Sequence, residues 1–538
     1  MSDLLAALFR LSLLLLPLAV LADGAVDHER QRIRLTLSSE PPNLNSTVTT
    51  DQISSFVLSH VMEGLLTYDA SNELSPGVAE RWELRQDGAT FWLRRNARWS
   101  DGKPVTAHDF VFAWRTAVDP KTASQYASAL YPVRNAERIN RGELPVTALG
   151  VEARGDFRLE VTFERPTPYF LGLTAFFTYY PIRQDFYESR GERYAADADD
   201  LLYNGPFVLQ RWVHGAHLRL RRNEHYWGRD HVGLYEIDIP YITTDTTAIF
   251  NLYQAGSIAL APLETETLRD AVRLGFTPKL FLTGSIYYLQ FNLREGRITT
   301  NRNLRKAIQA ILDPAVLVNK VVGLPGNLPS DSIFPTTVKG VELPFRTEYP
   351  APRPERGLGL ARHYLELARQ ELGLERIPPL VMLVGDGPRA NKEAEYFQQL
   401  FARGLGLDVR LDRQTAKQRL DKMSRGDFDI VAAGWGPDYD DPMTFGDLFA
   451  SWNENNRGRY RNPEYDRWVE IAATSPDPEQ RMRAFAEMQR LLMEDVPVLP
   501  LYESGNVYLQ HPQLRGVVRA IFGGDPNLRY AYVAGEDE

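Results

Sequence analysis

The chain contains no cysteine. This absence excludes disulfide bonds, cysteine nucleophiles and cysteine-ligated metal sites, and we expect no lipid anchor of the kind attached to an N-terminal cysteine. An excess of basic residues is also missing, since the 538 residues carry a formal net charge of −9. We therefore expect no nucleic-acid partner, because such a partner's phosphates need cations to neutralise them.

Long hydrophobic runs are scarce as well. The run LSLLLLPLAVLA at 11–22 is too short, and too interrupted by proline, to cross a bilayer of about 30 Å as a helix. Arg10 precedes it, and Val20 and Ala22 supply small residues before a cleavage site. This layout predicts a secretory signal peptide over residues 1–22, with a buried N-terminal helix as the alternative.

Catalytic signatures are missing too. The sequence has no G-x-S-x-G elbow, no H-E-x-x-H and no P-loop, and its Gly-x-Gly pairs lack the third glycine of a dinucleotide-binding fingerprint. The nine histidines show no ligand spacing, and the acidic stretches at 197–200 and 438–441 lack the EF-hand order of ligands. We predict a protein that is not an enzyme and has no metal or cofactor. An exported hydrolase is the rival from another class.

What is present indicates two or three α/β domains, since one compact core rarely grows to this size. Between residues 379 and 440, apolar strands at 380–384, 407–411 and 428–433 alternate with helical patterns at 391–405 and 416–424. This β-α-β-α-β order predicts a parallel sheet. A half-buried strand at 33–37, a helix over 50–65 and a capping box at Thr106–Asp109 are predicted elsewhere.

The loop after the last of these strands is the best candidate for a site. It reads GWGPDYDDP at 434–442. Ligands of open parallel sheets bind outside the carboxyl ends of the strands. Here Gly434 and Gly436 expose main-chain groups, Trp435 offers an apolar wall, and Asp438 can pair with a cation. The plainer alternatives are a core tryptophan and a turn aspartate.

Short motifs along the whole chain, from about residue 33 to the C-terminus, carry a family resemblance. They are EGLL at 63–66, PGVAE at 76–80, FWLR at 91–94, WSDG at 99–102, PVT at 104–106, DF at 109–110, VDPKTAS at 118–124, YAS at 126–128, NG at 204–205, AGW at 433–435 and DY at 438–439. In this order and spacing the chain resembles the periplasmic oligopeptide-binding proteins of ABC importers, a group that also includes dipeptide and murein-peptide receptors.

The resemblance implies an α/β fold of the periplasmic-binding-protein type II, with two lobes, a hinge and an extra inserted domain. Domain I would comprise residues 23–62, 183–286 and 502–538. Domain II, the insertion, would comprise 63–182, and domain III 287–501. The chain would cross between the lobes near residues 286 and 501, which would form the hinge.

The resemblance also implies how a ligand binds. An extended peptide would pair its backbone with the protein backbone like an added strand. Asp438 would bind the peptide's α-ammonium group, Gly434 and Gly436 would supply backbone hydrogen bonds, and Trp435 would line a side-chain pocket.

Three further residues are implied on the opposite side of the cleft. Thr50 and Gln52 would belong to the backbone-pairing segment of the other lobe, and Tyr126 would be a domain II tyrosine that faces the cleft. For Tyr126 the plainer alternative is again a core aromatic.

One departure from the family concerns the peptide's carboxylate. Where the best-known oligopeptide receptors have basic side chains, this chain has Ala390, Met423 and Ala432. Arg389, Lys392 and Arg425 lie nearby and can substitute. Otherwise the carboxylate end is solvated, or the ligand is not an ordinary peptide.

We therefore expect a periplasmic, monomeric receptor that binds short peptides and delivers them to the permease subunits of an ABC importer. The rivals within the same fold bind a murein peptide, a peptide-like antibiotic, an opine or a bile-acid-like amphiphile, the last being disfavoured by Asp438. A chaperone-like periplasmic protein is a further rival.

Overall fold

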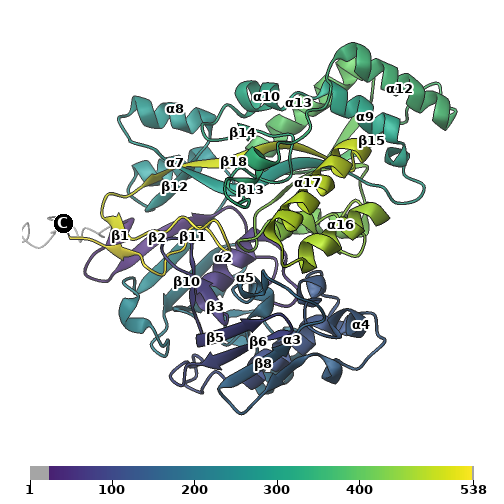
Figure 1. Cartoon of the computed structure of the whole chain (residues 1–538). Coiled ribbons are helices and arrows are strands. Elements are labelled where there is room, and N and C mark those ends of the chain that lie inside the picture. Colours follow the sequence, from purple (N-terminus) through teal and green to yellow (C-terminus); the bar gives the residue numbers. More distant parts are fainter. Residues whose placement is uncertain (1–23, 536–538) are drawn as a thin grey trace, which may run out of the picture.

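The computed structural model describes residues 24–535, so the predicted signal peptide lies outside the described residues. Three larger β-sheets organise the molecule, with seven, five and four strands (Figure 1). In that view the seven-stranded sheet lies at the top and the four-stranded sheet at the bottom. No helix among residues 24–535 combines the length and the apolarity needed to cross a membrane.

The seven-stranded sheet contains the predicted parallel segment. Its strands, in spatial order, are β12 (Leu260–Leu263), β18 (Val498–Gln510), β13 (Lys279–Phe291), β17 (Ile430–Trp435), β15 (Leu380–Gly385) and β16 (Val409–Gln414), with β14 (Leu328–Pro329) paired to β18. Strand β15 runs parallel to both β16 and β17, which confirms the predicted β-α-β-α-β unit.

The two crossover helices of this unit are α13 (Pro388–Leu405) and α14 (Ala416–Arg425). Helix α13 begins three residues earlier than the predicted helix, because Pro388 occupies its first turn, where the missing N–H costs no hydrogen bond. The predicted apolar face is buried, since Ala394, Phe397 and Phe401 are at most 1% exposed.

Strands β13 and β18 are the longest in the molecule's described part, with 13 residues each. They pair antiparallel and pass residues 286 and 501, where the sequence analysis places the crossings between lobes. The register of their pairing shifts between Leu282 and Ile286. Gly284 lies inside this irregularity with a φ of +68°, a conformation that favours glycine.

The five-stranded sheet joins the N-terminal segment to residues further along the chain. Its spatial order is β1 (Val26–Asp27), β2 (Arg32–Leu37), β11 (Glu236–Ile242), β10 (His217–Arg222) and β9 (Phe207–Val213). The predicted strand at 33–37 is therefore confirmed as β2, in which Ile33, Leu35 and Leu37 are buried. Helix α2 (Gln52–Val61) follows it and begins after the N-cap Asp51, whose side chain accepts a hydrogen bond from the Ser54 amide.

The four-stranded sheet consists of β5 (Ala79–Arg85), β6 (Gly88–Leu93), β8 (Arg158–Thr162) and β7 (Val151–Ala153). Helix α3 (Ala107–Val118) packs beside it. The predicted capping box is present at its start, where the Thr106 amide donates to the Asp109 carboxylate over 2.8 Å. Phe110 and Trp114 of this helix are fully buried, so its apolar face forms the core of this part.

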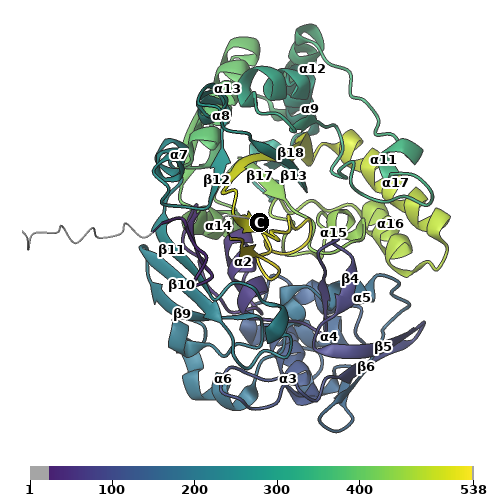
Figure 2. The same cartoon turned by 90° about the vertical axis from the view of Figure 1, so that its left-hand side faces the viewer.

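The remaining elements surround these sheets (Figure 2). They are β3 (Leu66–Tyr68), β4 (Leu74–Pro76), α4 (Ala136–Asn140), α5 (Phe170–Leu173), α6 (Gln184–Arg190), α7 (Thr246–Gln254), α8 (Thr265–Arg273), α9 (Arg302–Ile311), α10 (Pro314–Val316), α11 (Phe345–Glu348), α12 (Leu358–Leu372), α15 (Met443–Gly446), α16 (Pro463–Thr474), α17 (Pro478–Asp495), β19 (Leu514–Arg515) and β20 (Tyr532–Val533).

Candidate functional site

The predicted loop lies at the carboxyl end of β17, in the middle of the seven-stranded sheet. Strand β13 covers one edge of β17 along its whole length, from Ile430 to Trp435. Strand β15 covers the other edge only at Ile430 and Val431. Beyond these two residues no described strand pairs with that edge. The backbone from Ala432 to Trp435 is therefore accessible to an added strand, except at the Ala432 oxygen, which accepts a hydrogen bond from Arg419.

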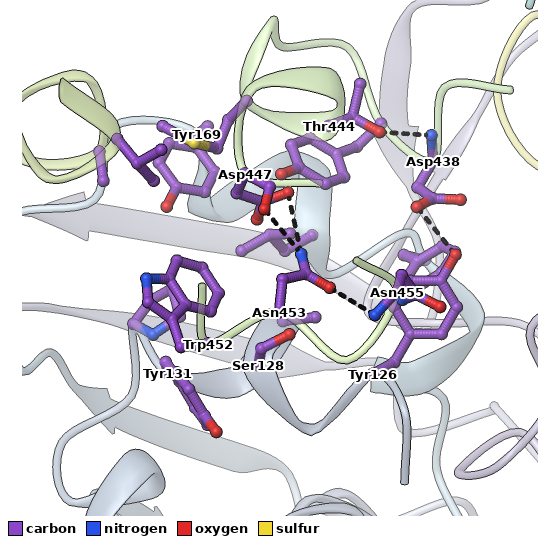
Figure 3. A pocket seen from close by; sticks show the side chains of 18 of the residues that line it. Tyr126, Ser128, Tyr131, Tyr169, Asp438, Thr444, Asp447, Trp452, Asn453 and Asn455 are labelled. Carbon is purple, nitrogen blue, oxygen red and sulfur yellow. Dashed lines mark hydrogen bonds between the residues drawn. The ribbon is translucent and has the colours of Figure 1, made fainter. Parts of the chain in front are cut away.

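Asp438 connects this loop to a distant part of the chain. Its carboxylate accepts a hydrogen bond from the hydroxyl of Tyr126 over 3.1 Å, although 312 residues separate the two (Figure 3). Its main-chain amide donates to the Thr444 hydroxyl over 2.9 Å, which holds the loop in place. The predicted pair Asp438 and Tyr126 is therefore brought together.

A cavity lies beside Tyr126, and Asp438 is the only carboxylate of the acidic stretch 438–441 that lines it. Asp440 is exposed and pairs with Lys339 over 2.7 Å. Asp441 pairs with Arg481 over 2.8 Å and also accepts from the Met443 amide at the start of α15. These neighbours stabilise the loop, whereas the Asp438 carboxylate remains directed toward the cavity and Tyr126.

Other residues predicted for the site also lie close to the loop after β17. The indole of Trp435 lies 6.2 Å from the ring of Tyr126. A Cβ placed on Gly436 would lie 3.0 Å from Nε2 of Gln52, so Gln52 at the start of α2 faces this glycine. Gly434 is exposed beside Tyr287, its pairing partner on β13. Thr50 is half-buried just before α2.

A cavity opens beside Asp438 and Tyr126, between the segment of residues 126–176 and the segment of residues 435–473. Seven aromatic residues contribute to its wall, namely Tyr126, Tyr131, Tyr169, Phe176, Trp435, Tyr439 and Trp452. Tyr169 stacks on Tyr439 with ring centroids 5.9 Å apart, and Tyr131 lies 5.8 Å from Trp452. Such a wall suits an apolar body or a cation.

Two carboxylates, Asp438 and Asp447, line this cavity (Figure 3). Burial raises the pKa of Asp438 well above that of an ordinary aspartate; the hydrogen bond from Tyr126 opposes this rise and the charge of Asp447 adds to it. Burial also raises the pKa of Asp447 to about 7, with a further contribution from Asp441. Ionising both carboxylates in the unliganded cavity is therefore energetically unfavourable, and a bound cation would reduce this free-energy cost.

The two predicted arginines are already paired with acids. Arg389, in the first turn of α13, donates to Glu264 over 3.0 Å. Burial opposes the charge of Arg389, yet Glu264 and its neighbours raise its pKa above that of an ordinary arginine. Arg425 is largely exposed at the end of α14 and pairs with Asp427 over 2.9 Å. Neither arginine lines the cavity.

A different arginine lies at the free edge of β17. Arg419 of α14 donates to the main-chain oxygen of Ala432 over 2.8 Å and forms no ion pair with a described carboxylate. Burial lowers the pKa of Arg419, and the electrostatic interactions of its guanidinium with Tyr287 and Tyr288 of β13 oppose this lowering. The structure thus places a guanidinium at the opposite end of the free edge from Asp438.

Asp447 and Arg419 are the residues that the sequence analysis missed. Asp447 is the one acid in the otherwise uncharged run MTFGDLFA at 443–450, and a charge inside such a run signals a buried carboxylate. Arg419 carries no comparable signal, because α14 is rich in basic residues. Among residues 24–535 there is no group of three or more histidine, aspartate or glutamate side chains suited to a metal ion.

Comparison with known proteins identifies similar chains over nearly the whole length. The model of a family described as bacterial extracellular solute-binding proteins, family 5 Middle, matches residues 73–457. The oligopeptide-binding protein OppA of Bacillus subtilis is 31% identical over 497 residues, which cover 90% of both chains. The periplasmic murein peptide-binding protein MppA of Escherichia coli is 30% identical and covers 93% of this chain and 92% of its own. The probable deoxycholate-binding periplasmic protein YgiS of Escherichia coli is also 30% identical, over 90% of both chains.

Solved structures show the same fold. OppA of Listeria monocytogenes bound to peptide superposes with a TM-score of 0.88 at 30% identity, covering 94% of this chain and 99% of its own. The murein tripeptide binding protein MppA of Escherichia coli gives 0.86 at 28% identity, with 95% and 100% covered. Its unliganded open form gives only 0.64 at the same identity, with 96% and 99% covered. The parts of the present structure are therefore arranged differently from those of that open form.

Proposed function

Because the chain belongs to family 5 of the bacterial extracellular solute-binding proteins, we propose that it is an exported, monomeric receptor that binds a short peptide and delivers it to the permease of an ABC importer. One observation carries this proposal. Asp438, at the carboxyl end of a central strand, meets Tyr126 from a distant part of the chain beside an acidic, aromatic cavity. This arrangement suits an ammonium group held between two lobes.

The fold provides the two lobes. It is the type II periplasmic-binding-protein fold, with an inserted third domain. We propose the boundaries that the family resemblance implies: domain I at 23–62, 183–286 and 502–538, domain II at 63–182, and domain III at 287–501. The separate four-stranded sheet supports domain II, and the long strands β13 and β18 support crossings near 286 and 501.

The peptide backbone would lie along the free edge of β17. With its ammonium group at Asp438, the peptide would run antiparallel to β17, past Gly436 and Gly434 toward Ala432. Four residues of extended chain span about 13 Å at roughly 3.3 Å per residue. Main-chain pairing of this kind ignores side-chain identity, which favours a receptor of broad specificity for peptides of about four residues.

Native mass spectrometry of the freshly purified protein tests the function. We expect a one-to-one complex whose added mass equals that of a short peptide or a set of short peptides, and we expect Asp438→Asn protein to carry less of it. A discrete non-peptide mass would instead indicate an opine, an antibiotic or an amphiphile. The two carboxylates of the cavity disfavour a bile-acid-like anion, despite the relative named for deoxycholate. Cleaved peptide would indicate a hydrolase, and heterogeneous binding of unfolded chains a chaperone.

The carboxyl end of the ligand gives a second prediction. We expect Arg419 to hold the terminal carboxylate, because Arg389 and Arg425 are paired with Glu264 and Asp427. Amidating the peptide's C-terminus should therefore cost wild-type protein tenfold or more in affinity, about 1.4 kcal/mol. The same amidation should cost the Arg419→Ala variant little. Calorimetry with both peptides measures this, with Arg425→Ala as the matched control. Equal binding of acid and amide by wild type would mean that this end is solvated.

A further inference from the structure

The cavity beside Asp438 contains a second carboxylate, although one carboxylate is enough to pair with the α-ammonium group of a peptide. Asp447, from the turn that follows α15, lines it together with Asp438. Within the described residues, its carboxylate accepts one side-chain hydrogen bond, from the amide of Asn453 at 3.4 Å, and the same amide donates to the main-chain oxygen of Asp447 at 3.0 Å. A carboxylate so weakly held in a partly buried cavity lacks a counter-charge.

The arginines nearby do not supply that charge. Arg165 lines the cavity, but its guanidinium pairs with Glu470. Arg481 pairs with Asp441 over 2.8 Å. Arg457 is 6% exposed and donates to Ser424 and to Asn455, a residue of the cavity wall, each over 2.9 Å. No ion pair joins Asp447 to any cation within the described residues 24–535.

The rest of the wall also suits a positive charge. Tyr169 and Tyr439 stack on one side of the cavity, and Trp452 lies beside Tyr131 on another. Aromatic faces attract ammonium and guanidinium groups, most strongly where water is excluded. The rings also offer an apolar surface along which the stem of a long basic side chain can lie. Neither feature is needed for the α-ammonium group, for which Asp438 and its partner Tyr126 are the proposed site.

We propose that this cavity is a subsite for a positively charged side chain on the first residue of the bound peptide, and that Asp447 is its anionic anchor. The inference rests on the proposed function, since it takes the peptide's α-ammonium group to lie at Asp438. It narrows the substrate class to peptides whose first residue has a positively charged side chain, such as lysine, arginine or another basic amino acid. Two neighbouring cations then neutralise two neighbouring carboxylates.

Calorimetry with a matched pair of peptides tests the subsite. Lys-Ala-Ala-Ala and its norleucine counterpart differ in the terminal ammonium of one side chain. We expect wild-type protein to bind the lysine peptide at least tenfold more tightly. We expect Asp447→Asn to abolish this preference while it still binds the norleucine peptide, which also shows that the variant is folded. Asp440→Asn, which removes an exposed acid of the same loop, should keep the preference.

The outcomes separate this inference from the function on which it rests. If wild type binds both peptides equally, or if Asp447→Asn keeps the preference for lysine, the subsite is refuted and the peptide receptor stands. If Asp440→Asn abolishes the preference as well, general negative charge and not Asp447 selects the ligand, which also refutes the anchor. If wild type binds neither peptide nor any other short peptide, the proposed function itself fails.

Discussion

Replacing Asp438 by asparagine should weaken binding of a free peptide by about 2–5 kcal/mol, the usual cost of removing one partner of a buried charge pair. The variant keeps the size of the side chain and can still accept the hydrogen bond from Tyr126. What it loses is the negative charge opposite the peptide's α-ammonium group. Isothermal titration calorimetry measures the loss directly.

An N-acetylated peptide supplies the matched comparison. Acetylation removes the positive charge from the ligand, as the substitution removes the negative charge from the protein, so the two changes together should cost far less than the sum of both. Asp440→Asn serves as the control variant, because Asp440 is exposed on the same loop and pairs with Lys339. If wild type binds the acetylated and the free peptide equally well, Asp438 is not the anchor.

The pH dependence of binding gives a further check on the same residue. Burial and the charge of Asp447 raise the pKa of Asp438 in the unliganded protein, whereas a bound ammonium group favours the ionised carboxylate. Binding should therefore release protons, and affinity should fall as the pH falls below the raised pKa values. The pKa of about 7 for Asp447 places part of this change near neutrality. Asp438→Asn should flatten the dependence.

The central part of the site follows from the sequence because it depends on local patterns. The strands and helices between 379 and 440 have distinct apolar periods, and a parallel sheet exposes its ligands at the carboxyl ends of the strands. This reasoning leads to the loop after β17, and the structure confirms the strand order that positions it. The family resemblance added Tyr126 as a partner from a remote part of the chain.

The rest of the site depends on tertiary packing, which local patterns do not encode. The sequence marks Asp447 only as a lone acid in an uncharged run, and its place in the cavity depends on Tyr169 and Trp452, which line the cavity from two different segments. Arg389 is near the right place in the sequence, but Glu264, 125 residues earlier, already pairs with it. Arg419 is one of several basic residues on α14, and only its contact with Ala432 sets it apart.

Saturation with a tight peptide should compact the protein and stabilise it. The present structure joins parts that a two-lobed receptor would separate on opening: Tyr126 contacts Asp438, Gln125 donates to Ser424 over 3.2 Å, and the Asp440 amide donates to the Tyr68 hydroxyl over 3.1 Å. It also superposes less well on an unliganded open relative, with a TM-score of 0.64, than on a peptide-bound relative, with a TM-score of 0.88. Few of these polar contacts are strong alone, so a ligand that bridges the lobes should decide the balance between open and closed forms.

Small-angle X-ray scattering with and without peptide tests this closure. The radius of gyration should fall on saturation, and the scattering of the complex should match the structure described here. A peptide at 100 times its Kd should add about 2.7 kcal/mol to the stability of the native state, because it binds that state alone. Trp435 should report the same event by fluorescence, since it lies 6.2 Å from Tyr126 in the closed arrangement. Asp438→Asn at the same peptide concentration should close less completely than wild type. An unchanged radius of gyration in wild type saturated with a tight peptide would contradict the hinge mechanism, because the ligand would then enter a cleft that does not close around it.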